Sequence, residues 1–171
     1  PKAPWVAVWE SPQTMVIPGF VMPSSVTADV LGNIYIAGYF GDSISFGSIT
    51  LTNGGMFIVK YDATGNAIWA KNYASTDQYN SGKGIVSDAS GNTYTAGYFY
   101  NSFVFGSTTL SASGKGIFVL KSDNIGNPIW AKSAGCTADD YANAICLDPI
   151  GNIYITVAYI NDNPFVLRNL Y

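Results

Sequence analysis

The chain has 171 residues, of which 48% are hydrophobic, 15% aromatic and only 11% charged, with a formal net charge of -3. No stretch gathers basic residues, which excludes the electrostatic attraction that supplies most nucleic-acid affinity. No apolar run is long enough to span a bilayer, so we expect no membrane insertion. Abundant aromatic residues, Gly, Ser, Thr and Asn favour strands and turns over helices. A start at Pro1 fits a processed or excised segment.

The sequence repeats itself. Gly-Asn-Ile-Tyr-Ile-Ala-Gly-Tyr-Phe at residues 32–40 returns with small changes at 91–99 and, shortened, as Gly-Asn-Ile-Tyr-Ile at 151–155. Recurrence at a nearly fixed period is the signature of a repeat architecture. The sequence therefore predicts one array over residues 1–171, with repeats at about 24–83, 84–143 and 144–171.

The expected strands follow a fixed order along the chain. Residues 1–10, with Pro-Trp-Val-Ala-Val-Trp, stand where the fourth strand of a repeat belongs. Each repeat should then contain a short apolar strand, the Tyr-rich strand, an apolar strand ending in Lys or Arg, and a Trp-containing strand. Apart from the Tyr-rich strand, their ranges are 26–28, 85–87 and 145–147, then 57–60, 118–121 and 165–168, then 68–71 and 129–132. Three complete four-stranded units result if the first and last strands share a sheet.

A shorter motif, Asp-x-x-Gly-Asn, occurs five times between these strands. An Asp that accepts hydrogen bonds from backbone amides, followed by Gly where φ is positive, predicts a tight hairpin turn. An Asp-rich turn can instead hold Ca²⁺, but the alternation of acidic residues in known calcium loops is absent, so we expect a structural role. The predicted turn residues are Asp29 and Gly32, Asp62 and Gly65, Asp88 and Gly91, Asp123 and Gly126, and Asp148 and Gly151.

Four antiparallel strands per repeat, apolar on both faces and joined as a meander, predict the blade of a β-propeller, whose sheets lie between neighbouring sheets. The expected fold is therefore all-β, with about three blades, or half a ring, in this chain. Because known propellers have roughly 4–8 blades, three cannot close a ring. We expect the remaining blades to come from a second copy or from a longer chain.

The motifs of the first repeat occur in a fixed order. They are Gly-Asn-Ile-Tyr-Ile-Ala-Gly-Tyr-Phe, Phe-Gly-Ser-Ile-Thr-Leu at 46–51, Phe-Ile-Val-Lys at 57–60, Asp-Ala-Thr-Gly-Asn at 62–66 and Trp-Ala-Lys at 69–71. This series resembles the bacterial β-propeller repeat called SBBP, over residues 24–160. The resemblance implies a propeller in a secreted or cell-surface prokaryotic protein, without an assigned activity. The third repeat departs from it by lacking the Phe-Gly-Ser-x-Thr-Leu element, and residues 11–23 depart as well.

Few side chains suit catalysis. The chain has no His and a single glutamate, Glu10, which excludes His-based triads, His–metal sites and the usual proton shuttles. A carboxylate pair of the glycosidase kind remains open, and Asp139 with Asp140 is the only adjacent pair, although a solvated loop explains it better. Cys136 and Cys146 either form one disulfide or remain two thiols.

In a meander, the two kinds of connection lie on opposite sides of the array. All five Asp-x-x-Gly-Asn turns belong to one side, and the longer, more varied connections belong to the other. Because binding concentrates on loops held by a rigid scaffold, we expect any ligand on this second side. The candidate residues are Tyr39, Asp42, Asp77, Tyr98, Tyr100, Asp139, Asp140 and Tyr141.

The leading hypothesis is a non-enzymatic extracellular or cell-surface module that serves as a scaffold or binds a glycan or surface protein. The alternatives are a lectin with one shallow site per blade, a glycan-active enzyme using carboxylates, and Ca²⁺ held by the acidic loops; otherwise we expect no cofactor or metal. Side chains that recur in register are expected to be structural rather than sugar platforms. They are Trp69, Trp130, Tyr94 and Tyr154 in the core between blades, and Lys60, Lys121 and Arg168 in ion pairs or snorkelling contacts.

Overall fold

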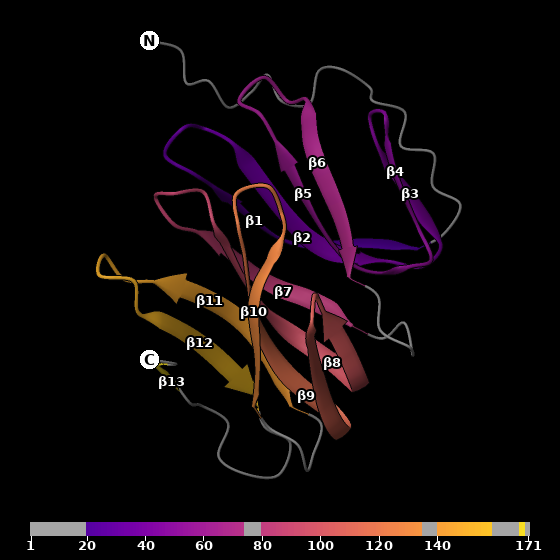
Figure 1. The fold of residues 1–171 in the computed structure, drawn as a ribbon, viewed down its shortest axis with the longest axis vertical. Helices are drawn as coiled ribbons and strands as arrows, with labels where there is room; N and C mark the ends of the chain where they lie inside the picture. The colour runs from indigo at the N-terminus through magenta and orange to yellow at the C-terminus, as the bar shows by residue number, and fades with distance from the viewer. Residues whose placement is uncertain (1–19, 74–79, 135–139, 159–167, 170–171) are drawn as a thin grey trace.

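The computed structural model describes residues 20–73, 80–134, 140–158 and 168–169 (Figure 1). Of these residues 72% lie in strands and none in helices, and every strand pair is antiparallel, which confirms the all-β prediction. Within the same residues, no helix is long and apolar enough to cross a membrane.

The first repeat forms a four-stranded meander. Its strands are β1 (Val21–Ala28), β2 (Ile34–Phe40), β5 (Gly55–Tyr61) and β6 (Ala67–Tyr73), in the order β1-β2-β5-β6. Strand β1 begins at Val21, well before the predicted start at residue 26. The register with β2 shifts between Pro23 and Ser25, and such a bulge lets a strand continue past a proline.

The second repeat forms an equivalent meander with longer central strands. Its strands are β7 (Ser81–Ser87), β8 (Thr93–Phe105), β9 (Thr108–Ser122) and β10 (Pro128–Ala134), in the order β10-β9-β8-β7. The β8–β9 ladder continues beyond a register shift between Tyr100 and Ser102.

The third sheet has three strands in the described part, in the order β11-β12-β13. They are β11 (Tyr141–Leu147), β12 (Ile153–Ala158) and β13 (Arg168–Asn169). Of the third strand predicted at 165–168, only Arg168 is described, and the strand predicted at 1–10 lies outside the described residues. Of the three predicted four-stranded units, two are complete in the described residues. The described sheets close no ring.

The sequence analysis assigned no strand to the Phe-Gly-Ser-x-Thr-Leu element, and the structure places strands there. In the first repeat this element builds a separate hairpin of β3 (Ser43–Phe46) and β4 (Ile49–Thr52), and in the second it forms the end of β8 and the start of β9. Each hairpin lies on its own sheet, with Phe46 against Phe57 at 5.3 Å between ring centroids and Phe103 against Phe118 at 5.2 Å. Aromatic packing explains why the hairpin folds back.

The three sheets pack face to face in chain order (Figure 1). One apolar cluster joins the first sheet to the second and includes Tyr35, Ile58, Ile85 and Phe118. A second cluster joins the second sheet to the third, and a third lies on the outer face of the first sheet. Strand β7 contacts both β1 and β11, so the first strands of the three repeats lie together, whereas β6 and β10 share little or no contact.

Candidate functional site: the sheet faces and a lysine–tyrosine cluster

The five Asp-x-x-Gly-Asn motifs are tight hairpin turns in which each Asp carboxylate accepts hydrogen bonds from its own turn. At Asp62, Oδ1 accepts bonds of 2.9 Å from the amides of Thr64 and Asn66. The Thr64 hydroxyl and the Asn66 groups lower the pKa of Asp62 to about 2. These bonds occupy the oxygens that a cation would need. Among the described residues, no group of three or more Cys, Asp or Glu side chains is arranged to hold a metal ion.

The turns of the second sheet also accept hydrogen bonds from the first sheet. The Tyr35 hydroxyl donates to the Gly91 carbonyl oxygen at 3.2 Å, and the Tyr73 hydroxyl donates to that of Gly126 at 3.0 Å. The indole Nε1 of Trp69 donates to the Asn124 carbonyl at 3.1 Å. Because a buried donor without a partner is costly, these bonds fix how one sheet sits on the next.

The aromatic residues that recur in register contribute to these inter-sheet contacts. Trp69 belongs to the cluster between the first and second sheets, and Tyr94 to the next cluster with Trp130 packed against it, so the core prediction is confirmed for all three. Tyr154 is half-buried on the third sheet. The structure therefore gives Trp69, Tyr94 and Trp130 a packing role.

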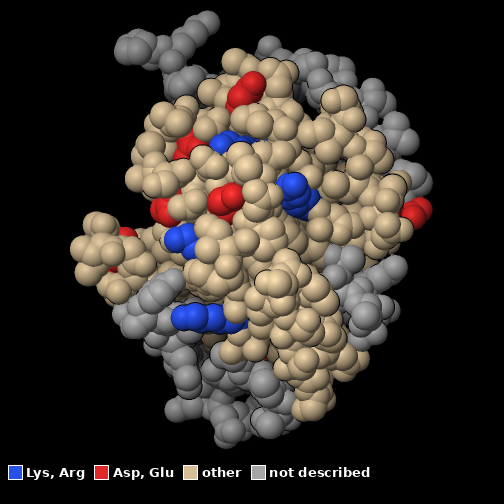
Figure 2. All heavy atoms as spheres, viewed as in Figure 1, with Lys and Arg blue, Asp and Glu red and all other residues tan. Residues whose placement is uncertain are grey.

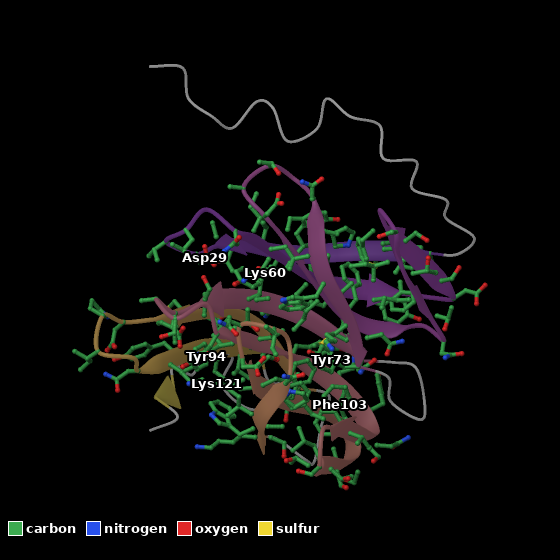
Figure 3. The ribbon with its side chains drawn as sticks, turned by 45° about the horizontal axis from the view of Figure 1, so that its top comes forward. Asp29, Lys60, Tyr73, Tyr94, Phe103 and Lys121 are labelled. Carbon is green, nitrogen blue, oxygen red and sulfur yellow. The ribbon has the colours of Figure 1, made fainter. Side chains whose placement is uncertain are left out.

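The recurring lysines lie over tyrosine rings. The ammonium nitrogens of Lys60 and Lys121 lie 5.0 and 4.8 Å from the ring centroids of Tyr35 and Tyr94. Figure 3 labels Lys60, Lys121 and Tyr94. This cation–π contact was not predicted, although it agrees with a structural role. The side chain of Arg168 is outside the described part of the chain.

A lysine–tyrosine cluster of Lys115, Tyr98, Tyr100 and Tyr141 lies between the second and third sheets. The Lys115 side chain is only 6% exposed, and its Nζ lies 4.9, 4.9 and 3.7 Å from the ring centroids of Tyr98, Tyr100 and Tyr141. Lys115 also donates a hydrogen bond to the Tyr141 hydroxyl. Burial opposes the charge, yet hydrogen bonds with Tyr141 and Tyr100 raise the pKa of Lys115 above its usual value. The cluster therefore holds a charged ammonium among aromatic rings.

Three strands supply this cluster. Strand β8 carries Tyr98 and Tyr100, β9 carries Lys115 opposite Tyr100 in the ladder, and β11 begins at Tyr141. Asp140 lies next to it, 3% exposed, with its amide 3.5 Å from the Lys115 carbonyl oxygen. Burial raises the pKa of Tyr98, and the positive charge of Lys115 partly offsets this increase.

Four of the eight candidate ligand residues therefore come together, namely Tyr98, Tyr100, Asp140 and Tyr141. Of the other four, Tyr39 is half-buried on β2, Asp42 is exposed between β2 and β3, and Asp77 and Asp139 lie outside the described residues. Because the structure does not describe Asp139, the geometry of the Asp139–Asp140 pair is not described either. Cys146 is an exposed free thiol on β11, and Cys136 lies in an undescribed segment.

Lys115 was missed by the sequence analysis, although a comparison between repeats contains the signal. Tyr100 and Lys115 face each other across the β8–β9 ladder, at positions where the first repeat has Gly41 and Gly54. Substitution of a glycine pair by a tyrosine and a lysine marks this repeat as different. The cluster is therefore a property of the second repeat and does not recur in the first.

The faces of the outer sheets differ from the faces inside the stack. Val26, Ile85 and Ile145 occupy the same strand position in the three repeats, each opposite the equivalent residue of the next strand. Ile85 is 3% exposed and Ile145 is 9% exposed, because each packs on the preceding sheet, whereas Val26 is 64% exposed.

Figure 2 shows that charged side chains are scattered thinly over the visible face.

No family model matches the chain, and no curated protein matches it in sequence.

Proposed function

We propose that this protein is a non-enzymatic scaffold and interaction module built from β-propeller blades and located outside a prokaryotic cell or on its surface. The exposure of Val26, at a position that is buried in the next two repeats, carries this proposal. The equivalent faces of the second and third sheets are buried against a preceding sheet. The outer face of the first sheet is therefore suited to packing against another sheet. The resemblance to SBBP repeats supports the location.

The arrangement of the sheets supports blades rather than an ordinary sandwich. In a propeller the blades surround an axis, so their innermost strands lie close together while their outer strands diverge. Here β7 contacts both β1 and β11, whereas β6 and β10 share little or no contact. The apolar residues on both faces of the second sheet agree with a blade between two others. The open outer faces require further blades, from a second copy or a longer polypeptide.

The described carboxylates support a non-enzymatic role. Four of the turn Asp residues have a lowered pKa and accept hydrogen bonds within their turns, and Asp140 is almost fully buried beside the lysine–tyrosine cluster. A general acid in a glycosidase needs a raised pKa and room for the sugar between two carboxyl groups. The four turn Asp residues, with a lowered pKa and with their oxygens engaged in the turn, do not meet these requirements.

An activity panel tests this function. The full chain should release no product from glycoside and ester substrates at a rate proportional to protein concentration. Asp140→Asn is the informative variant, and Asp42→Asn, at an exposed acid, is its matched control. Turnover that Asp140→Asn abolishes and Asp42→Asn retains would establish an enzyme instead.

A second candidate, a lectin, is favoured by one observation. The Tyr98, Tyr100 and Tyr141 rings are half-buried, and the ammonium group of the half-buried Lys83 lies 5.5 Å from the Tyr98 ring centroid. Such a surface suits a sugar carrying a carboxylate. Because the first repeat lacks the Tyr100–Lys115 pair, this proposal is for one site rather than one per blade.

A glycan array separates the two candidates. A lectin should retain acidic glycans, lose them in Tyr100→Ala and keep them in Tyr61→Ala, which alters a half-buried tyrosine on the first sheet. An array without hits would remove the lectin and leave the scaffold.

A further inference from the structure

We propose that the Lys83 ammonium and the Tyr98 hydroxyl together bind one carboxylate group, at the edge where the first strands of the three repeats meet. This inference rests on the lectin candidate and deepens it, because it names the two groups that hold the acid of the sugar. The ligand is an acidic sugar with a single negative charge, such as a uronic acid, bound once per chain.

The first strand of each repeat carries a bulge at the same position. The register shifts of β1, β7 and β11 each leave one residue outside the ladder, namely Ser24, Lys83 and Asn143. A bulge re-aims a side chain, and bulges are over-represented beside active sites. All three repeats therefore present a polar side chain at this position, and only the second repeat presents a charge.

Lys83 stands on the middle one of these three strands, since β7 contacts both β1 and β11. Two residues beyond Lys83, the Ile85 amide donates a 3.2 Å hydrogen bond to the Ser25 hydroxyl of β1. On the other side, a Cβ added at Gly84 would lie 3.0 Å from the Ile145 amide nitrogen of β11. The bulge of β7 therefore lies close to both neighbouring strands.

Two lysines lie near the Tyr98 ring, and they differ in what else they contact. The Lys115 ammonium, 4.9 Å from the ring centroid, is buried and donates a hydrogen bond to the Tyr141 hydroxyl, with the buried Asp140 beside it. The Lys83 ammonium lies 5.5 Å from the same centroid in a half-buried position, and it forms no hydrogen bond or ion pair with the described part of the chain. Lys115 is therefore a structural charge, whereas Lys83 is the charge that a ligand can reach.

The Tyr98 hydroxyl is the second group of the site. Tyr98 is half-buried, and its hydroxyl has no hydrogen-bond partner among the described residues. Tyr141 packs on the ring in an edge-to-face arrangement, with the centroids 5.5 Å apart, and so fixes its orientation. Because Lys83 lies over this same ring, the two oxygens of one carboxylate can accept hydrogen bonds from the ammonium and the hydroxyl.

The charge of the site favours a carboxylate over a phosphate. One ammonium is reachable and the hydroxyl beside it is neutral, so a single negative charge balances the site. A phosphate monoester carries about 1.5 to 2 negative charges at pH 7 and would place an uncompensated charge in a half-buried position. A carboxylate instead accepts a charge-assisted hydrogen bond, which is stronger where water is partly excluded.

NMR titration of the full chain tests the site, with glucuronate as the acidic sugar and glucose as its neutral counterpart. Glucuronate should shift the resonances of Lys83 and Tyr98, and glucose should not. Lys83→Met should weaken glucuronate binding by about tenfold or more, because it removes a hydrogen bond from a charged donor, and Lys83→Arg should restore most of the affinity. Lys132→Met is the matched control and should bind as the wild type does, since the exposed Lys132 ammonium lies 5.4 Å from a different ring, that of Trp130.

A second variant keeps the test independent of the lysine. Tyr98→Phe retains the ring and its packing and removes only the hydroxyl, so the chain should fold and bind glucuronate more weakly. Equal affinity of the wild type and Lys83→Met, or equal shifts with glucose and glucuronate, would overturn the site. Tighter binding of inorganic phosphate than of glucuronate would overturn the carboxylate assignment.

The results also separate this site from the proposed functions. No glucuronate binding, together with acidic glycans that the array retains and Tyr100→Ala loses, would reject this site and keep the lectin. Glucuronate bound at Lys83 in a protein whose turnover Asp140→Asn abolishes would keep the site and reject the non-enzymatic function.

Discussion

The hydroxyl of Tyr35 donates a 3.2 Å hydrogen bond to the carbonyl oxygen of Gly91, which lies 56 residues further along the chain in the next sheet. This single bond joins the two repeated motifs of the sequence, the Tyr-rich strand and the Asp-x-x-Gly-Asn turn. The single hydroxyl proton of Tyr35 is shared between Gly91 and the carboxylate of Asp29 in its own turn, whose Oδ2 lies 3.1 Å away. The same residue therefore links a strand, its turn and the neighbouring sheet.

Tyr35→Phe should lower the free energy of unfolding by about 1–3 kcal/mol, because it leaves the buried Gly91 carbonyl oxygen without this donor. Urea denaturation measures the change. Tyr61→Phe is the control, since burial alone raises the pKa of Tyr61 and its hydroxyl does not join two sheets. Equal losses for the two variants would contradict the role given to the inter-sheet bond.

Gly126→Ala should destabilise the chain more than Gly65→Ala. Both glycines have positive φ, 82° and 89°, so both substitutions carry the strain of roughly 1–2 kcal/mol for a side chain in that conformation. At Gly126 the added methyl would also lie 3.0 Å from the Lys71 side chain and 3.1 Å from the Trp69 ring, whereas at Gly65 it meets nothing within 4 Å. The difference in urea midpoints measures the contact between sheets, and equal midpoints would refute it.

Stability should fall as the pH is lowered from about 4 towards 2. The folded-state pKa of Asp62 is lowered to about 2 by the Thr64 hydroxyl and other turn hydrogen bonds, and those of Asp29, Asp123 and Asp148 are lowered as well. The unfolded chain therefore binds more protons in this window, so the stability present above the ordinary Asp pKa is lost as pH falls through the folded value.

NMR titration of the Asp62 carboxyl checks the cause. In Thr64→Val its pKa should rise towards the usual value, because the largest contribution to the shift is gone. An unchanged titration would show that the turn hydrogen bonds do not set the pKa.

Much of the fold could be predicted from the sequence because the residues that define it recur. The Tyr-rich strand and the turn Asp and Gly locate β2, β8 and β12 in three independent copies. The hairpin of β3 and β4 was missed although Ile44, Phe46, Ile49 and Leu51 alternate with polar residues, a pattern typical of strands. The early start of β1 was not predicted, because a proline such as Pro23 usually interrupts a strand. The bulge beside Pro23 that lets the strand continue cannot be recognised from the sequence alone.

The candidate site was less predictable. Tyr98, Tyr100 and Tyr141 were chosen because they lie near long connections, but their common partner, Lys115, depends on the cross-strand register of β8 and β9. Whether Tyr141 reaches that lysine depends further on how the third sheet packs on the second. Neither relation is local in sequence.

Lys115→Met should destabilise the chain by about 1–3 kcal/mol, since it removes a buried ammonium that contacts three rings and bonds to Tyr141. Lys83→Met should change stability by less than about 1 kcal/mol, because the Lys83 ammonium lies 5.5 Å from the Tyr98 ring in a half-buried position. Thermal unfolding of both variants compares them. A larger loss for Lys83→Met would contradict the central place given to Lys115.

A crystal structure of the full chain in its solution assembly tests the central claim most directly. It should show β1, β7 and β11 innermost around an axis, with the outer faces of the first and third sheets each covered by another blade. A structure in which both outer faces are open to solvent, or in which the sheets stack without a common axis, would contradict the account.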